Sequence, residues 1–536
     1  MLILLTSQFV SGQQKITDTK KLEKVLRDHI EFLSDDKLEG RRTGSPGEKL
    51  AHTYISRQFE KAGLQKIGSG NYLQSFEVND GRSLTADNQL LINNKPVQLH
   101  TNYFPLAYSG NGKVYLVKDD ILLADTFKIA SLLEENKTNP HFDLKAAIVE
   151  RAISAEKKGK TALIIKDNSS VVPDNLKFDE KDKTPFLKIP VIYINDKNSA
   201  DPQMANLGKG NIVVTVNISD KKRTGNNVIG FINNHASSTI ILGAHYDHLG
   251  YGEDRNSLYS GNEKKIHNGA DDNASGTAAL LELASMLSKS QLKNNNYLFI
   301  AFSGEELGLY GSKFFVENIP SQVTNINYMI NMDMIGRLND STRGLSVGGY
   351  GTSPLWNSLV TSNDPYLKIK LDSSGSGPSD HTSFYRKDIP VLFFFTGTHQ
   401  DYHKPSDDAD KINYAGEAQV IRYIYNIIEL SDTKGKLSFT KTREAASMGK
   451  SSFKVSMGIM PDYTFSGNGV FVDGVTDGRA AQKAGIKRGD VILQLGEHKF
   501  SDVQTYMGAL NKFNKGETTK VKVLRGKEEL MFDIVF

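Results

Sequence analysis

A series of short apolar runs, separated by helical segments, constrains the fold of this chain more than any other feature. The runs are Thr239–His245, Tyr297–Ser303, Tyr328–Asp333 and Val391–Phe395. Strands that are buried on both faces of a sheet have this nearly continuous apolar character. Between the runs, apolar residues recur at helical spacing, as they do across Leu280–Leu287. The alternation predicts an α/β fold in which helices sandwich a mostly parallel sheet.

The chain has 536 residues, which is too long for a single hydrophobic core. Changes in composition predict two parts of the α/β domain at residues 13–105 and 223–435, an insert at 106–222, a polar linker at 436–450 and a last unit at 451–536. The insert has short β-like runs at Lys113–Lys118, Ala146–Glu150, Ala162–Lys166, Pro190–Asn195 and Ile212–Ile218. We therefore expect it to be mostly β with a few helices.

The overall composition excludes several kinds of partner. The 65 Lys and Arg residues nearly balance the 62 Asp and Glu residues, and a net charge of +3 gives no reason to expect nucleic acid as a partner. No run of about 18 apolar residues occurs, so we expect no membrane span. The chain has no cysteine, so a metal would be bound by His and carboxylate side chains. Residues 1–12 resemble the remnant of a signal peptide, which predicts export.

Five motifs that carry metal-binding side chains follow one another within the predicted α/β domain. They are GAHYDHLGYG, NGADDNASGT, FSGEELGLYGS, NMDMIGR and DYHKPSDD. Four of them lie at or just past the C-terminal end of a predicted strand, where open α/β sheets bind ligands. Side chains that are distant in the sequence can therefore meet at one edge of the sheet. Two His, three carboxylates and one additional Glu are the side chains that a two-metal hydrolase requires.

Each motif taken alone also permits a purely structural role. Acidic residues that precede a helix can cap it or interact with its dipole, and a single His at a strand end or in a turn is commonly structural. Asp333 differs, because a lone acid in an apolar run is costly unless it is paired or bound to metal. Asp247, two residues after His245, can orient a ligating imidazole. The ordered set of motifs indicates one metal site.

These motifs resemble those of the co-catalytic di-zinc aminopeptidases, the family of the Aeromonas and Streptomyces leucine aminopeptidases, which is related to glutamate carboxypeptidase and the transferrin receptor. The resemblance implies a zinc-exopeptidase fold and two Zn²⁺ ions per chain. It also implies that His245 and Asp333 bind one ion and that Glu306 and His403 bind the other. Asp272 would bridge the two ions, and in this family the peptide bond after that Asp is cis.

The same resemblance implies roles for side chains beside the metals. Glu305 matches the general base, Asp247 matches the carboxylate that orients a ligating imidazole, and Tyr402 matches an aromatic donor that steadies the tetrahedral intermediate. Asp380 and His381 fall at a position that frames the site, without a fixed role.

The expected reaction is the removal of N-terminal residues from peptides by a hydroxide that bridges two zinc ions, with Glu305 carrying the proton. Metal binding lowers the pKa of water from 15.7 to about 7. Three alternatives stay open. A single-zinc acyltransferase like glutaminyl cyclase could keep most of the same positions. A carboxypeptidase of acidic dipeptides would need an Arg cluster, for which Arg255, Arg337 and Arg343 are available. The third alternative is a binding scaffold without catalysis.

The flanking units also resemble known modules. Residues 106–222 are similar to a protease-associated domain. Residues 451–536 resemble a PDZ domain, on the evidence of Arg479–Phe500 and the MGI turn at Met457–Ile459. A PDZ domain captures the C-terminus of a peptide by strand addition. The sequence Asn273-Ala-Ser is an N-glycosylation signal inside a metal motif, where a glycan would block the site. This favours a bacterial periplasmic or secreted protein over one from a eukaryotic secretory route.

Overall fold

The structure is a computed structural model of the chain. It describes residues 19–67, 70–116, 124–137, 142, 144–167, 177–182, 184–195, 210–261, 263–442, 455–461, 468–475, 478–500, 503–510 and 512–536. The predicted signal-peptide remnant, residues 1–12, and the second half of the predicted linker lie outside the described residues. The chain divides into two compact units, one of which consists mainly of Glu77–Arg223.

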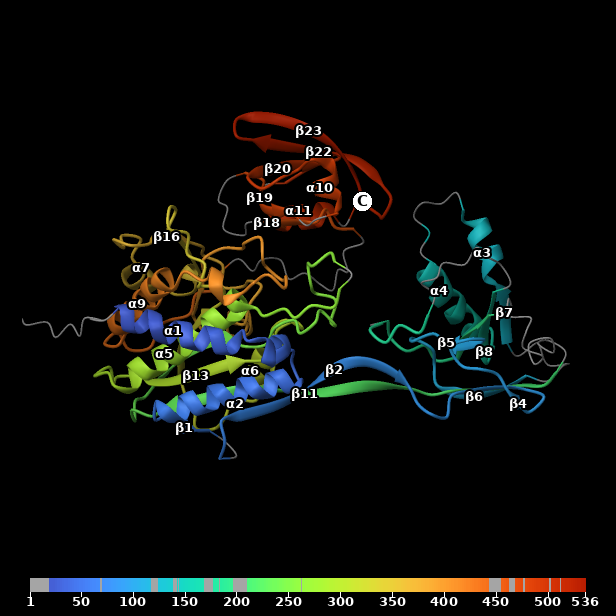
Figure 1. Cartoon of the computed structure of the whole chain (residues 1–536), viewed down its shortest axis with the longest axis horizontal. Coiled ribbons are helices and arrows are strands. Elements are labelled where there is room, and N and C mark those ends of the chain that lie inside the picture. Colours follow the sequence, from blue (N-terminus) through green and yellow to red (C-terminus); the bar gives the residue numbers. More distant parts are fainter. Residues whose placement is uncertain are drawn as a thin grey trace, which may run out of the picture. The chain divides into compact units, whose positions relative to one another are not determined.

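A nine-stranded mixed sheet is the centre of the other unit, as far as the described residues show (Figure 1). Its strand order is β1-β11-β13-β12-β14-β17-β15-β16, with β2 paired to β11. The strands are β1 (Gln65–Lys66), β2 (Leu73–Leu84), β11 (Ile218–Ile232), β12 (Thr239–His245), β13 (Asn296–Phe302), β14 (Ile326–Met332), β15 (Gly344–Gly348), β16 (Lys368–Leu371) and β17 (Val391–Phe395). The central strands β13, β12, β14 and β17 run parallel, whereas β11 and β15 pair with them in the antiparallel sense. The predicted α/β fold with a mostly parallel sheet is confirmed.

Helices cover both faces of this sheet (Figure 1). They are α1 (Thr19–Leu33), η1 (Asp36–Arg41), α2 (Pro46–Lys61), η4 (Ala270–Ser275), α5 (Gly276–Ser288), α6 (Tyr310–Glu317), η5 (Tyr350–Thr352), α7 (Trp356–Leu359), α8 (His381–Tyr385), η6 (Ala409–Lys411) and α9 (Tyr414–Ser431). Helices α1, α2, α5 and α9 share one apolar core with Ile240 of β12. Helices α6 and α8 share another core with the adjacent residue, Ile241. Because successive side chains of a strand point to opposite faces, β12 is buried on both sides, as its apolar sequence predicts.

The unit around Glu77–Arg223 contains two four-stranded sheets among its described residues, ordered β4-β3-β10-β6 and β5-β9-β8-β7. Its elements are β3 (Gln89–Ile92), β4 (Lys95–Pro96), β5 (Tyr103–Pro105), β6 (Gly112–Leu116), β7 (Ala124–Lys128), α3 (Ile129–Glu135), α4 (Leu144–Lys157), β8 (Ala162–Asp167), β9 (Val191–Asn195) and β10 (Ile212–Val216). The unit begins before residue 106, where the insert was expected to start, because β3 pairs with β10 and β5 pairs with β9.

One predicted strand of this unit is wrong. Ala146–Glu150 lies within α4, which runs from Leu144 to Lys157. The buried residues of α4 are Ile148, Ala152 and Ala155, which recur at helical spacing. A short apolar run does not distinguish a strand from a buried turn of helix, and the helical pattern becomes visible only over the longer segment.

The described residues of the C-terminal part of the chain form a sheet of order β18-β19-β20-β22-β23, with β21 paired to β20. Its elements are β18 (Ile459–Pro461), β19 (Val470–Val475), α10 (Ala480–Ala484), β20 (Asp490–Leu495), β21 (His498–Lys499), α11 (Val503–Leu510), β22 (Thr518–Arg525) and β23 (Glu528–Val535). Asp490 is buried and accepts two hydrogen bonds from the Arg525 guanidinium, at 2.7 and 2.8 Å. This bidentate pair joins the start of β20 to the end of β22.

No helix in the described part of the chain is both long enough and apolar enough to cross a bilayer.

Candidate metal centre

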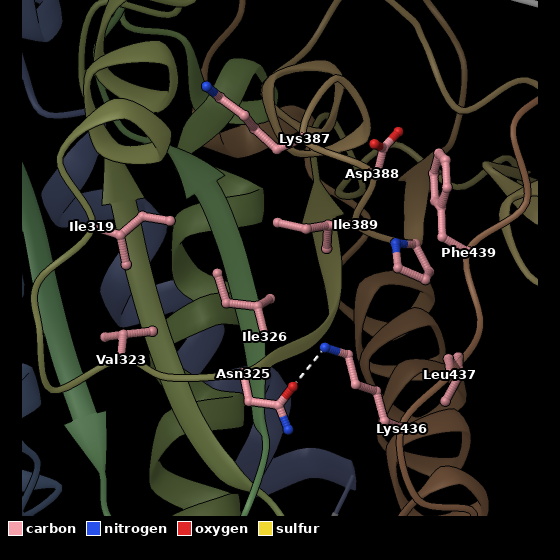
Figure 2. A pocket seen from close by; sticks show the side chains of 11 residues that line it. Ile319, Val323, Asn325, Ile326, Lys387, Asp388, Ile389, Lys436, Leu437 and Phe439 are labelled. Atoms are coloured by element: carbon pink, nitrogen blue, oxygen red, sulfur yellow. Dashed lines mark hydrogen bonds between the residues drawn. The ribbon is translucent and has the colours of Figure 1, made fainter.

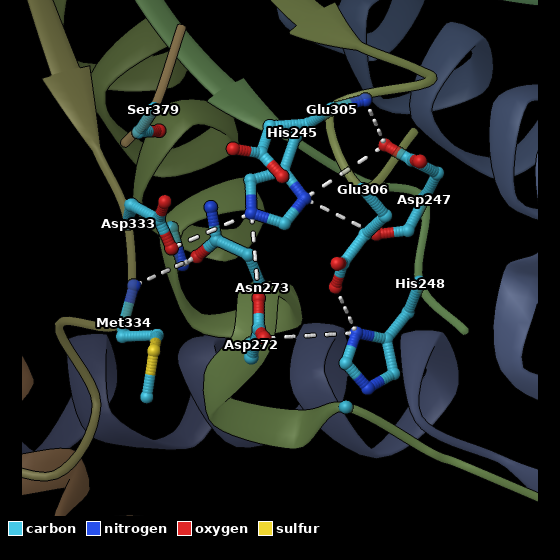
Figure 3. Close-up of polar contacts among 12 residues, drawn as sticks. His245, Asp247, His248, Asp272, Asn273, Glu305, Glu306, Asp333, Met334 and Ser379 are labelled. Atoms are coloured by element: carbon cyan, nitrogen blue, oxygen red, sulfur yellow. Dashed lines mark hydrogen bonds and ion pairs between the residues drawn. The ribbon is translucent and has the colours of Figure 1, made fainter. Parts of the chain in front are cut away.

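Four of the five predicted motifs meet at the C-terminal ends of the parallel strands (Figure 3). His245 is the last residue of β12, Glu305 and Glu306 follow β13, and Asp333 follows β14. Asp272 lies in the irregular segment η4 that precedes α5, and its peptide bond to the next residue is cis. Because parallel strands end at one edge of a sheet, loops that are far apart in sequence place these side chains together.

One set of donor atoms surrounds the His245 imidazole. Its Nε2 lies 3.4 Å from Oδ1 of Asp272 and 3.4 Å from Oδ1 of Asp333. The His245 side chain is 2 % exposed. These three atoms form a compact group with one nitrogen and two carboxylate oxygens.

A second set uses the other oxygen of Asp272. Nε2 of His403 lies 3.3 Å from Oδ2 of Asp272 and 3.2 Å from Oε2 of Glu306. The two oxygens of the Asp272 carboxylate therefore face two different groups of donors. This is the arrangement that a carboxylate between two metal ions would adopt.

The donor sets fit zinc in both chemistry and spacing. Ligands that lie about 2.0–2.1 Å from a tetrahedral zinc are roughly 3.3 Å apart from one another, and the separations above are 3.2–3.4 Å. The donors are imidazole nitrogens and carboxylate oxygens, and the chain offers no thiolate. Asp272 and Asp333 also offer oxygen atoms within 4.8 Å of one another, and burying two carboxylates this closely is unfavourable without a cation between them.

The orientation of both imidazoles is set by backbone carbonyls. Nδ1 of His403 lies 2.9 Å from the carbonyl oxygen of Asn256, and Nδ1 of His245 lies 3.2 Å from that of Asp247. Each ring thereby turns its Nε2 toward the carboxylates. The Asp247 carboxylate is farther from the His245 ring, at 3.8 Å. It accepts hydrogen bonds from the Thr43 hydroxyl and from the Glu305 backbone N–H, at 2.9 and 3.2 Å.

The two adjacent glutamates have opposite pKa shifts. Burial, together with the carboxylates of Glu306 and Asp333, raises the pKa of Glu305 well above its ordinary value, although His245 opposes this. Burial also acts to raise the pKa of Glu306, but the imidazoles of His403 and His248 together outweigh it and lower the pKa to about 2. Environments that separate the pKa values of paired carboxylates are typical of sites where one group handles protons and the other stays ionised.

Tyr402 lies beside the second donor set. Its ring stacks on the imidazole of His403, with ring centroids 3.9 Å apart. Burial and the nearby carboxylates raise the pKa of Tyr402 well above its ordinary value, so the phenol keeps its proton.

Three further residues at the centre were not found from the sequence. The guanidinium of Arg41 is fully buried and donates to the backbone carbonyls of Leu33, Tyr246, Asn268 and Gly269, which ties together the loops that carry the first two motifs. Asp407 accepts the backbone N–H groups of Asp271 and Asp272, both at 3.0 Å. His248 contacts Glu306. Arg41 sits in the turn-rich EGRRTGSPGE, and nothing in that composition points to a buried cation.

The remaining candidates have structural contacts. His381 stacks on Phe393 with centroids 4.4 Å apart, and Asp380 is fully buried and helps to raise the pKa of Glu305. Arg337 pairs with Asp401 at 3.2 Å, so this carboxylate already engages it.

A separate pocket of about 380 Å³ lies at the opposite edge of the sheet (Figure 2). Its lining includes Ile326, the first residue of β14, Ile389, two residues before β17, and Phe439. It contains no residue of the metal centre.

Comparison with known proteins gives matches to two family models. Residues 227–428 match the model of peptidase family M28, and residues 438–535 match that of the PDZ domain. Residues 227–428 of the α/β domain are therefore similar to peptidase family M28.

Among its relatives, aminopeptidase YwaD of Bacillus subtilis is 27 % identical in an alignment of 332 residues that covers 55 % of this chain and 67 % of that protein. Leupeptin-inactivating enzyme 1 of Streptomyces exfoliatus is 32 % identical over 179 residues, but these are 33 % of this chain and only 36 % of that enzyme. The structure of an aminopeptidase from Aneurinibacillus sp. strain AM-1 aligns with a TM-score of 0.42 and 23 % identity, covering 79 % of this chain and 96 % of the other.

Proposed function

We propose that the chain is a zinc-dependent aminopeptidase that removes N-terminal residues from peptides and uses two zinc ions. The observation that carries this proposal is the Asp272 carboxylate, whose two oxygens face two separate donor sets. His245 and Asp333 would complete one zinc site, and Glu306 and His403 would complete the other. The name of the Bacillus relative, an aminopeptidase, supports the same reaction.

The bound zinc ions would supply Lewis acidity, which lowers the pKa of water and polarises a carbonyl group. Glu305 would accept a proton from the attacking water and return it to the amine that leaves. The Asp247 carboxylate would hold Glu305 in place by accepting its backbone N–H. The Asp247 backbone carbonyl would keep the His245 ring in its orientation. The protonated Tyr402 hydroxyl would donate a hydrogen bond to the oxygen that becomes negative in the transition state.

A panel of short peptides with free and acetylated N-termini, together with aminoacyl-nitroanilides, tests the proposal on zinc-loaded protein. We expect cleavage of free N-termini only, and loss of this cleavage with a chelator. Cleavage of the acetylated peptides would refute the aminopeptidase assignment. Cyclisation of an N-terminal glutamine with one zinc per chain would instead support the acyltransferase alternative.

We further propose roles for the other units. The unit around Glu77–Arg223 would be a protease-associated module. The PDZ domain would bind a peptide C-terminus along β18, which pairs only with β19 among the described residues. Fluorescence polarisation with labelled peptides that end in a free or an amidated carboxyl group tests this binding, which should require the free carboxylate.

We also propose that the protein acts in the bacterial periplasm or outside the cell, where peptides reach it. Fractionation of cells that express the full chain tests this. Activity confined to the cytoplasmic fraction would contradict it.

A further inference from the structure

His248 is a third imidazole at the candidate metal centre, and neither of the two donor sets described above includes it. It lies in the loop that follows β12, three residues after His245, and its side chain is 0 % exposed. Its Nδ1 lies 2.9 Å from Oε1 of Glu306 and 3.8 Å from Oδ2 of Asp272 (Figure 3). His248, Asp272 and Glu306 offer a group of donor atoms that could itself hold a metal ion. His248 is therefore either a metal ligand or a hydrogen-bond donor to one.

The distances favour the second role. Two ligands of one tetrahedral zinc lie roughly 3.3 Å apart, whereas 2.9 Å is the usual length of an N–H···O hydrogen bond. The oxygen that His248 contacts is also not the one that faces His403, because His403 lies 3.2 Å from Oε2 of Glu306. The two oxygens of this carboxylate thus have different partners.

The position of the proton supports the same conclusion. Nε2 of His248 is buried and has no hydrogen-bond partner in the described structure. If Nδ1 bound a metal, the proton of the neutral ring would be on Nε2, where it would be a buried N–H without an acceptor, which is rare in proteins. If Nδ1 carries the proton and donates to Glu306, Nε2 keeps only an unused lone pair.

From this geometry we infer that His248 is a positioning residue: it donates Nδ1–H to Oε1 of Glu306 and so presents Oε2 to the metal site shared with His403. The inference rests on the proposed zinc function. A carboxylate that binds metal through one oxygen leaves the other as a strong acceptor, and in a buried site a fixed donor takes the place of water. Such partners of metal ligands typically affect metal affinity by about 10–100-fold.

The surroundings of His248 restrict the position of its ring, as a positioning role requires. Its backbone N–H donates to the carbonyl of Arg41 at 3.3 Å. Gly269, with a φ of +57°, comes so close that a Cβ there would lie 2.5 Å from Cδ2 of the His248 ring. The ring also makes an edge-type contact with the ring of His403, with centroids 6.0 Å apart and an interplanar angle of 73°. These contacts fix the direction of Nδ1.

Two variants distinguish the effect of losing the hydrogen bond from the effect of losing the volume of the ring. His248→Leu removes the donor, and His248→Asn keeps a side-chain N–H near the position of Nδ1. His29→Leu is the control, because His29 is also a buried histidine but contacts Tyr54 and Glu282 between helices. Thermal unfolding of the metal-free proteins shows that each variant folds, and competition with a chromophoric chelator gives the zinc affinities.

We expect His248→Leu to weaken one of the two zinc affinities by about 10–100-fold, with most of the loss recovered in His248→Asn and no change in His29→Leu. The visible absorption spectrum of the fully cobalt(II)-loaded protein should keep its shape in His248→Leu, because no ligand is lost. A changed coordination spectrum would overturn the inference and make His248 a ligand. Zinc affinities equal to those of His29→Leu would overturn it as well. Wild-type protein that binds no zinc would overturn the proposed function together with this inference.

Discussion

Asp407 connects two of the loops that carry proposed metal ligands, and its removal should weaken both the fold and the proposed metal site. Its side chain is buried, and one carboxylate oxygen accepts the N–H groups of Asp271 and Asp272 at 3.0 Å each. The Asp407 carbonyl accepts the N–H of Ala270. Asp407→Ala leaves two buried N–H groups without an acceptor, at about 1–3 kcal/mol each. The expected loss in the free energy of unfolding is therefore about 2–6 kcal/mol.

Urea denaturation measures this loss. The relevant unfolding transition is the one whose midpoint changes when zinc is added, since zinc binding stabilises the domain that contains the metal centre. Asp407→Asn retains an oxygen acceptor, so at most about half of the loss is expected. Asp410→Ala is the control, because Asp410 is exposed in the same segment and its replacement should change stability by less than about 0.5 kcal/mol. Equal stability and equal zinc affinity of Asp407→Ala and Asp410→Ala would refute the reasoning.

Two other predictions address the proposed general base and the PDZ domain. Glu305→Gln should retain its zinc but lose at least ~10²–10⁴-fold in peptidase rate, and full activity at full zinc occupancy would exclude Glu305 as the base. In the PDZ domain, burial acts to raise the pKa of Asp490, but the Arg525 guanidinium and the Lys487 backbone N–H together outweigh this and hold it below the ordinary 3.8. Asp490 therefore stabilises the fold above about pH 3.8, and this contribution is lost as the pH falls through the lower folded-state pKa. Unfolding temperatures measured between neutral pH and pH 3 should show a weaker acid dependence in Asp490→Asn than in the exposed control Asp533→Asn, and identical profiles would contradict the assignment.

The features that the sequence predicted well are those that depend on local pattern. The run Thr239–His245 is apolar throughout because β12 is buried on both faces, and the strand begins and ends at the predicted residues. The five proposed ligands could be picked out because metal chemistry restricts the residue types and because strand ends bring them to one edge. Ala146–Glu150 was wrongly predicted to be a strand because five residues are too few to show a helical pattern of apolar side chains.

The features that were missed depend on contacts between distant segments. β3 pairs with β10, which is far away in the sequence, and no local sequence pattern indicates this pairing. Arg41 acts only through backbone carbonyls from other loops, so residue type gives no hint of its partners. Asp407 and His248 lie within motifs that were recognised. Their side chains were indistinguishable from neighbouring polar residues until the loops were placed in space.

The number of zinc ions bound per chain, counted by native mass spectrometry, tests the central claim most directly. The wild-type chain should bind two zinc ions, because the two oxygens of Asp272 face separate donor sets. Asp272→Ala should hold at most one ion, and weakly, because each donor set loses a ligand. A wild-type chain that saturates at one zinc, or an Asp272→Ala variant that still carries two, would contradict the account.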